Sequence, residues 1–248
     1  MKMKKLIIIL ILASGLIIGL SHQRTEAQQT PDFDLNWSTN TYISPDYPGK
    51  ALPITNSRIK VTAIPTAKLV DNESTFTYNW FLDDRFIRQF SGEGKTTFNF
   101  LAKDEANYVY HVKVRILDKN ARFITQKDIF IKLVKPESIL KVISTDTPIG
   151  NLLANTELFI HTTGDLKIQA IPYFFNANPT NLDFSWQLDN QTLSDPTKKN
   201  PDFLTLTFQD IKPIFTKNLS WLITNKDNPN EKSVNQLNVS NINTITSD

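Results

Sequence analysis

A short motif occurs twice in this chain of 248 residues, and the repeat constrains the fold more than any other feature of the sequence. The first copy, YNWFLD, runs from Tyr78 to Asp83, and the second, FSWQLD, runs from Phe184 to Asp189. In each copy one small polar residue separates the first aromatic residue from the tryptophan, which places both rings on one face of a β-strand. We therefore expect two tryptophan-bearing strands at equivalent places in two related units.

Other alternating segments recur in the same order and at nearly the same spacing. RIKVTAIP at residues 58–65 matches DLKIQAIP at residues 165–172. Two further strands match as well, the second after insertion of one residue: Phe98 and Phe100 correspond to Leu204 and Leu206, and Val112, Val114 and Ile116 correspond to Leu219, Trp221 and Ile223. The chain is thus predicted to be an internal duplication, with a period typical of whole domains.

The predicted fold class is all-β. No stretch after residue 28 sustains helical periodicity, whereas alternating apolar and polar residues recur throughout. A unit of about 100 residues with short strands, polar turns and one early tryptophan is typical of a Greek-key β-sandwich. We expect one sandwich at residues 28–136 and a second at residues 137–248, with a boundary near Pro136.

The tryptophans of these strands are predicted to be structural core residues. A large flat ring fills the space between two sheets about 10 Å apart. Since the chain contains no cysteine, aromatic and aliphatic side chains must fill this space without a disulfide. The predicted core tryptophans are Trp80, Trp186 and Trp221, with Tyr110 and Val112 as neighbours of Trp80, and Leu219 and Trp221 as neighbours of Trp186.

A resemblance to a known family rests on the order of these strands. A Y-x-W strand, a turn with glycine, an F-x-F strand and a long Y-x-V-x-V strand resemble immunoglobulin-like domains of the PKD type in bacterial exported and surface proteins. The resemblance covers residues 35–135 and 140–240, and it implies a shape and a surface location without an assigned activity. The PKD signature places glycines and an aspartate after the tryptophan strand, where this chain has FLDDR and QLDNQ.

The N-terminal segment, residues 1–27, is typical of an export signal. Three lysines within the first five residues precede an apolar run from Leu6 to Leu20, and small residues suit cleavage after Ala27. The alternative is an uncleaved membrane anchor, although a 15-residue helix spans only roughly 22 Å. Either interpretation places the remaining chain across a membrane, outside the cell or on its surface. Membrane contact is then expected only through residues 6–20, and only if this segment is not cleaved from the chain.

Composition narrows the possible functions. Lys and Arg exceed Asp and Glu only by 27 to 25, which argues against a dedicated nucleic-acid binder. The absence of cysteine excludes thiol chemistry and thiolate metal sites. The chain has three histidines, His22, His111 and His161, and they are far apart in sequence. No metal site or catalytic triad is therefore indicated, and no cofactor is expected.

Acidic side chains in predicted turns leave calcium binding open, although turn aspartates usually bond to their own backbone. These carboxylates are Asp83, Asp84, Asp104, Glu105 and Asp189. The predicted function is a non-enzymatic exported protein whose tandem modules serve as a spacer or as a protein-binding platform in adhesion or assembly. One alternative is a carbohydrate-binding protein that stacks sugars on Tyr42, Tyr47 and Phe81. A second alternative is a hydrolase with an unrecognised carboxylate pair.

Overall fold

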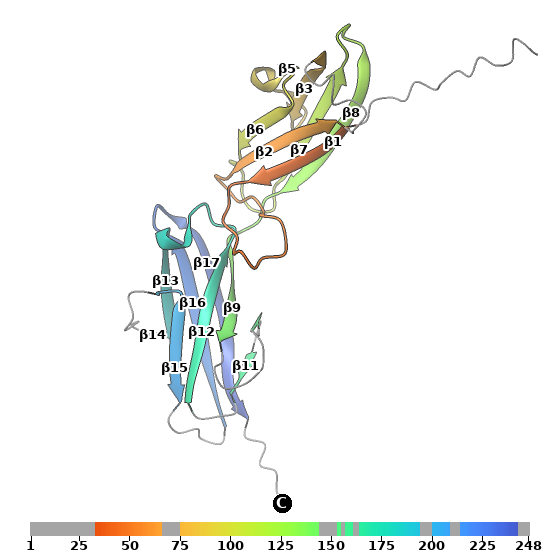
Figure 1. The fold of residues 1–248 in the computed structure, drawn as a ribbon. Helices are drawn as coiled ribbons and strands as arrows, with labels where there is room; N and C mark the ends of the chain where they lie inside the picture. The colour runs from red at the N-terminus through yellow and green to blue at the C-terminus, as the bar shows by residue number, and fades with distance from the viewer. Residues whose placement is uncertain are drawn as a thin grey trace, which may run out of the picture.

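The computed structural model describes residues 33–65, 75–143, 153–154, 157–160, 164–193, 200–208 and 214–242. Within these ranges the chain forms β-strands, with short 3-10 turns at Arg88–Phe90 and Pro179–Asn181, and the predicted all-β class is confirmed. The strands build two β-sandwiches that lie end to end (Figure 1). The predicted export segment, His22 and His161 lie outside the described residues.

The first sandwich is made of the strands before Pro136. One sheet has the order β1-β2-β6, formed by Phe33–Thr39, Arg58–Pro65 and Thr97–Leu101. The other has the order β4-β3-β7-β8, formed by Arg85–Phe86, Thr77–Leu82, Val109–Leu117 and Phe123–Lys132. A two-residue strand β5, Gly92–Glu93, also pairs with β3, where the sequence predicted only a turn.

The second sandwich repeats this plan. One sheet has the order β10-β9-β12-β15, formed by Leu153–Ala154, Glu137–Ile143, Gly164–Tyr173 and Phe203–Phe208. The other has the order β11-β17-β16-β13-β14, formed by Glu157–Phe159, Asn228–Ile242, Ile214–Asn225, Leu182–Leu188 and Gln191–Leu193. Pro136 lies between β8 and β9, in the chain that connects the two sandwiches.

Strand registers agree with the duplication found in the sequence. Trp80 lies opposite Val114, and Trp186 lies opposite Trp221, the residue that the sequence alignment matched to Val114. In the other sheet of each sandwich, Val61 faces Phe98 and the matching Ile168 faces Leu204. Equivalent residues therefore have equivalent cross-strand neighbours, which sets the same face of each strand toward the core.

Both motif tryptophans lie in the cores. Trp80 is 0% exposed and Trp186 is 2% exposed. Each indole N–H donates a hydrogen bond to a backbone carbonyl 15 residues later, at 2.9 Å to Lys95 and 3.1 Å to Pro201. The rings of Trp186 and Trp221 lie 6.4 Å apart, and Tyr110 and Val112 belong to the same apolar cluster as Trp80. Each ring is thus buried without leaving its polar N–H unpaired.

Each motif also ends in the same tight turn. The turn residues have left-handed backbones, with φ of 49° at Asp83 and 62° at Asp84, and 50° at Asp189 and 66° at Asn190. Two consecutive residues of positive φ are the signature of a type I′ hairpin, which suits the twist of the flanking strands. The carboxylates of Asp83 and Asp189 each accept the backbone N–H of a residue on the neighbouring strand, at 2.9 Å. The aspartate of the motif therefore ties its turn to the next strand.

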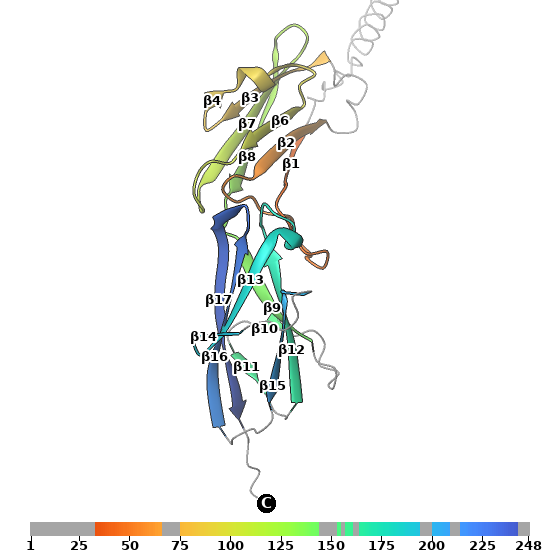
Figure 2. The same ribbon diagram turned by 90° about the vertical axis from the view of Figure 1, so that its left-hand side faces the viewer.

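The sandwiches differ in the segment that connects their first strand to the long strand beside it. In the second sandwich this segment contains β11, which pairs in parallel with β17. In the first sandwich the corresponding segment, residues 40–57, reaches the second sandwich instead (Figures 1 and 2). This segment, called the junction loop below, positions the candidate site.

Candidate functional site at the junction of the two sandwiches

The junction loop is attached to the second sandwich by backbone hydrogen bonds. Tyr42 N–H donates to the carbonyl of Phe175, and Phe174 N–H donates to the carbonyl of Tyr42, both at 2.7 Å. This reciprocal pair forms an isolated antiparallel bridge between residues far apart in the sequence. At the other end of the loop, the carbonyl of Pro53 accepts the N–H of Val134 at 2.9 Å. The loop is therefore held both to the second sandwich and to the connecting chain.

An apolar cluster fills the space under the loop. Its buried members are Ile54, Tyr173 and Phe174, with exposed fractions of 2%, 7% and 3%. Tyr47 contributes a ring whose centroid lies 5.0 Å from that of Tyr173 and 5.6 Å from that of Phe174. Half-buried aliphatic side chains complete the cluster: Ile43, Leu52, Val134, Ile139 and Ile171. Because aromatic pairs add to the free energy of area burial, this cluster stabilises one arrangement of the sandwiches.

Phe174 has an unusual backbone conformation, with φ of 61°. A positive φ is uncommon for a bulky residue and stores strain that surrounding contacts must offset. Here the hydrogen bond to Tyr42 and the packing against Tyr47 supply those contacts. The strain thus lies at the point where the second sandwich meets the junction loop.

A polar bridge lies beside the apolar cluster. Glu231 is 5% exposed, and its carboxylate accepts the backbone N–H of Asn176 at 2.6 Å and the side-chain amide of Asn176 at 3.2 Å. The same Asn176 amide nitrogen donates to the carbonyl of Thr55 in the junction loop at 3.0 Å. One asparagine therefore links a buried carboxylate of the second sandwich to the backbone of the first. Charge-assisted bonds of this kind are stronger than neutral ones.

Burial also affects two tyrosines of the junction. It raises the pKa of the Tyr173 phenol, with a smaller contribution from the Asp46 carboxylate. It likewise raises the pKa of Tyr42, to which the Asp202 carboxylate contributes. Both phenols therefore stay neutral at neutral pH.

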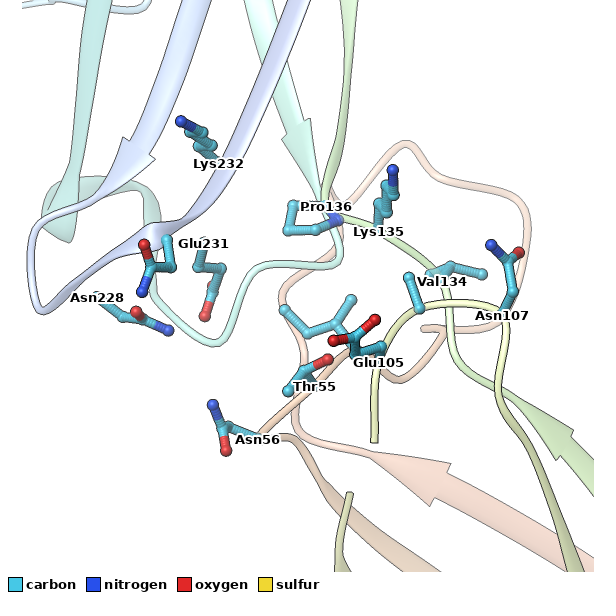
Figure 3. Close-up of a pocket in the computed structure, with 13 residues that line it drawn as sticks. Thr55, Asn56, Glu105, Asn107, Val134, Lys135, Pro136, Asn228, Glu231 and Lys232 are labelled. Carbon is cyan, nitrogen blue, oxygen red and sulfur yellow. The ribbon is translucent and has the colours of Figure 1, made fainter. Parts of the chain in front are cut away.

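An open cleft of about 750 Å³ lies between the sandwiches on the Asn56 and Asn228 side of the junction (Figure 3). Ile54, Val134 and Pro136 give it an apolar part. The polar lining comes from both sandwiches and from the connecting chain: Thr55, Asn56, Glu105, Asn107, Lys135, Asn228, Asn230, Glu231 and Lys232. Amides and charges of both signs make this a surface for polar contacts. Within the described ranges there is no group of three or more His, Asp or Glu side chains suited to hold a metal ion.

The three aromatic residues predicted to stack on sugars lie in two places. Tyr42 and Tyr47 belong to the junction, where Tyr47 packs against Tyr173 and Phe174. Phe81 lies on the first sandwich, 5.5 Å from the ring of Phe86. The Lys113 and Arg115 cations each lie 5.3 Å from the Phe81 ring. The structure therefore does not assemble the three rings into one platform.

Four of the five carboxylates considered for calcium have protein partners: Asp83, Asp84, Asp104 and Asp189. Asp84 and Asp189 pair with Lys113 and Lys217, and the lysine hydrogen bond is the main cause that lowers the pKa of each carboxyl. Asp104 accepts the hydroxyl of Tyr110. Glu105 lines the cleft.

Sequence reasoning missed the residues that make the junction. The sequence patterns did not indicate a role for Tyr173, Phe174, Asn176 or Glu231. A signal was nevertheless present in the sequence. After the matching strands, the second repeat continues as PYFFN at residues 172–176, whereas the first continues as PTAKL at residues 65–69. Three consecutive aromatic residues without counterparts in the other copy indicate a contact that only one unit makes.

Comparison with known proteins gives distant likenesses. No protein-family model matches the chain, and no curated protein matches it in sequence. The fibronectin(III)-like modules of CbhA from Clostridium thermocellum are 13% identical, with 84% of this chain and 93% of that chain covered and a TM-score of 0.27. Immunoglobulin domains 1–4 of Sidekick-1 are 12% identical, with 84% of this chain and 66% of that chain covered and a TM-score of 0.26.

A third likeness is to SGBP-B of the Bacteroides ovatus mixed-linkage glucan utilization locus, solved in complex with a mixed-linkage heptasaccharide. It is 12% identical, with 83% of this chain and 71% of that chain covered and a TM-score of 0.23. At these TM-scores the likenesses carry no argument about function. The described ranges also contain no helix long and apolar enough to cross a membrane.

Proposed function

We propose that this chain is a non-enzymatic exported protein whose two Ig-like sandwiches form one stiff spacer that presents binding surfaces to a protein partner. The junction carries this proposal. A loop of the first sandwich is bonded to and packed on the second, so that the two units behave as one elongated body. Export is supported by the basic and apolar N-terminal sequence up to Leu20.

Residual dipolar couplings test the stiffness directly. If the junction is rigid, the couplings of both sandwiches fit a single alignment tensor. The double variant Tyr47→Ser with Phe174→Asn removes the ring contacts while keeping a residue that tolerates the left-handed backbone, and it should require two tensors. Phe86→Ser, at a ring that is 50% exposed on the first sandwich, is the matched control and should leave one tensor. Two independent tensors in the unmodified chain would contradict the proposal.

The carbohydrate-binding alternative gains no support from the positions of the aromatic rings. Tyr47 is engaged by Tyr173 and Phe174, and Phe81 packs against Phe86 on the first sandwich. A glycan array with the triple variant of Tyr42, Tyr47 and Phe81 checks this alternative. The hydrolase alternative needs two available carboxylates, and Glu231, one of the two that line the cleft, has both oxygens bonded to Asn176.

A further inference from the structure

Strand β8 forms one edge of its sheet. Among the described residues its only paired neighbour is β7, and no strand pairs with its outer side. The strand is 10 residues long, and Phe123 and Phe130 are each 64% exposed. A long edge with exposed apolar side chains can add a further strand.

The second sandwich shows what covers the equivalent edge. Phe130 lies opposite His111, and Asn238 lies opposite Asn218, so Asn238 is the counterpart of Phe130. At that position β17 is paired with β11, in which Glu157 lies opposite Asn238. The chain following β11 adds a hydrogen bond from Ile160 N–H to the Ser240 carbonyl at 2.9 Å. The duplicated fold is therefore able to seat a short parallel strand on this edge.

The first sandwich uses the corresponding segment for another purpose. The chain between β1 and β2 is the junction loop, which packs on the second sandwich and so supplies no equivalent of β11. Because the junction loop packs on the second sandwich, it does not pair with the edge of β8. The contact between the sandwiches and the open edge of β8 thus both follow from the position of this loop.

Backbone geometry sets which groups face the open edge. Leu133 N–H donates to the Tyr108 carbonyl at 2.8 Å, which fixes the alternation of hydrogen bonds along the antiparallel pair. By that alternation, the N–H and carbonyl groups of Asp128, Phe130 and Lys132 point away from β7. An incoming strand would meet these groups, as β11 meets Asn238 and Ser240 in the second sandwich.

Charge indicates the kind of strand that fits. Residues 109–135, which contain β7 and β8, hold seven Lys or Arg side chains and two Asp side chains. The counterpart in the second sandwich, residues 216–242, holds three Lys and two acidic side chains. The positive charge therefore belongs to the sandwich whose edge is open. It favours an acidic segment and disfavours edge-to-edge pairing with a second copy, which would bring two such hairpins together.

We propose that β8 binds an extended segment of a partner protein as an added parallel strand, in which acidic residues alternate with apolar ones. The pattern resembles the chain's own β11, whose sequence is Glu-Leu-Phe. Main-chain hydrogen bonds give the affinity, and the basic hairpin selects the acidic side chains. This proposal rests on the proposed function, because it names the surface and the partner class of the binding platform.

A fluorescent peptide of alternating Glu and Leu residues tests the site on the full chain. We expect saturable binding by fluorescence anisotropy, and weaker binding when Gln replaces Glu in the peptide or when salt is raised to about 0.5 M. Phe130→Pro removes an outward N–H without breaking a bond to β7, so it should weaken binding at least about tenfold. Phe130→Ala, which keeps the N–H, should bind within about threefold of the unmodified chain. Thermal unfolding confirms that both variants fold.

Lys132→Glu gives a second test that does not depend on proline. This variant should weaken binding of the Glu peptide more than binding of the Gln peptide, because it replaces a positive charge at the open edge with a negative one. No binding of either peptide up to about 1 mM, or equal binding by Phe130→Pro, would overturn the proposal. A concentration-dependent dimer that Phe130→Pro abolishes would also overturn it, since the occupant would then be a second copy. None of these outcomes changes the result expected from the residual dipolar couplings. A failure of the proposed strand binding can therefore be distinguished from a failure of the proposed rigid spacer.

Discussion

At the scale of single residues, each motif tryptophan is among the largest buried side chains of its sandwich, and its indole N–H also donates a hydrogen bond to a backbone carbonyl. Trp80→Ala removes the ring from a site with 0% exposure and leaves the Lys95 carbonyl without its partner. We expect a loss of about 3 to 5 kcal/mol in the free energy of unfolding, measured by urea denaturation. Val234→Ala, at a side chain that is 66% exposed, is a suitable control with a loss below about 0.5 kcal/mol. A loss below about 1 kcal/mol for Trp80→Ala would mean that the ring is not a core element.

Tyr110 makes a contact that only the first sandwich has. Its hydroxyl accepts the backbone N–H of Lys103 at 2.9 Å and of Asp104 at 3.2 Å, and it donates to the Asp104 carboxylate. The equivalent position in the second sandwich is Lys217. Tyr110→Phe leaves two backbone donors without this acceptor, and we expect a loss of about 1 to 3 kcal/mol in unfolding free energy. The comparison variant is Tyr108→Phe, which removes a hydroxyl that donates to Asp83 at 3.1 Å from an exposed ring. It should cost less than Tyr110→Phe, because water can replace an exposed bond.

The same phenol predicts a dependence on alkaline pH. Burial, followed by the hydrogen bond to Asp104, raises the pKa of Tyr110 to about 12 from the ordinary value of 10.0. Because the folded-state pKa is the higher one, the contribution to stability is fully present below pH 10.0 and is lost as the pH rises toward about 12. We expect the unfolding free energy to fall across this window, and to fall less in Tyr110→Phe. An identical pH profile in the variant would assign the alkaline loss to other groups.

At the scale of the element, the hairpin turn after each motif depends on residues that tolerate positive φ. Asn190 has φ of 66°, so Asn190→Ala forces a Cβ-bearing residue with no compensating side-chain amide into the left-handed region. We expect a loss of about 1 kcal/mol for the alanine variant, and a change within about 0.5 kcal/mol for Asn190→Gly. Urea denaturation of the two variants measures the difference. Equal losses in both would point to a side-chain contact of Asn190 and not to its backbone.

The elements also show which parts of the fold a sequence can reveal. Strands β2, β3, β6, β7 and their counterparts were predictable because alternation has a period of two and the duplication repeats it, register included. The pairing of β11 with β17 and the docking of the junction loop were not. Both depend on short, irregular segments whose contacts are made with distant residues, so no local period marks them. The aromatic run Tyr173 to Phe175 was visible only as a difference between the two copies.

At the scale of the whole molecule, the junction contacts cross the predicted domain boundary at Pro136. The apolar cluster draws Ile54 and Tyr47 from one side of that boundary, and Tyr173 and Phe174 from the other. Residues 137–248 alone would expose the two rings that the junction loop covers. We expect this piece to fold, since its core around Trp186 is internal, but to be less stable than the same sandwich in the full chain by about 2 to 4 kcal/mol.

Hydrogen exchange of amides in β16, compared between the isolated piece and the full chain, measures this difference because it reports the stability of one sandwich at a time. The double variant Tyr47→Ser with Phe174→Asn should reproduce most of the loss within the intact chain, since it removes the same ring contacts without cutting the connection. If the piece and the full chain protected β16 equally, the junction would contribute nothing to the second sandwich. The two units would then be joined only by the chain near Pro136, and the contacts of the junction loop would leave their relative orientation free.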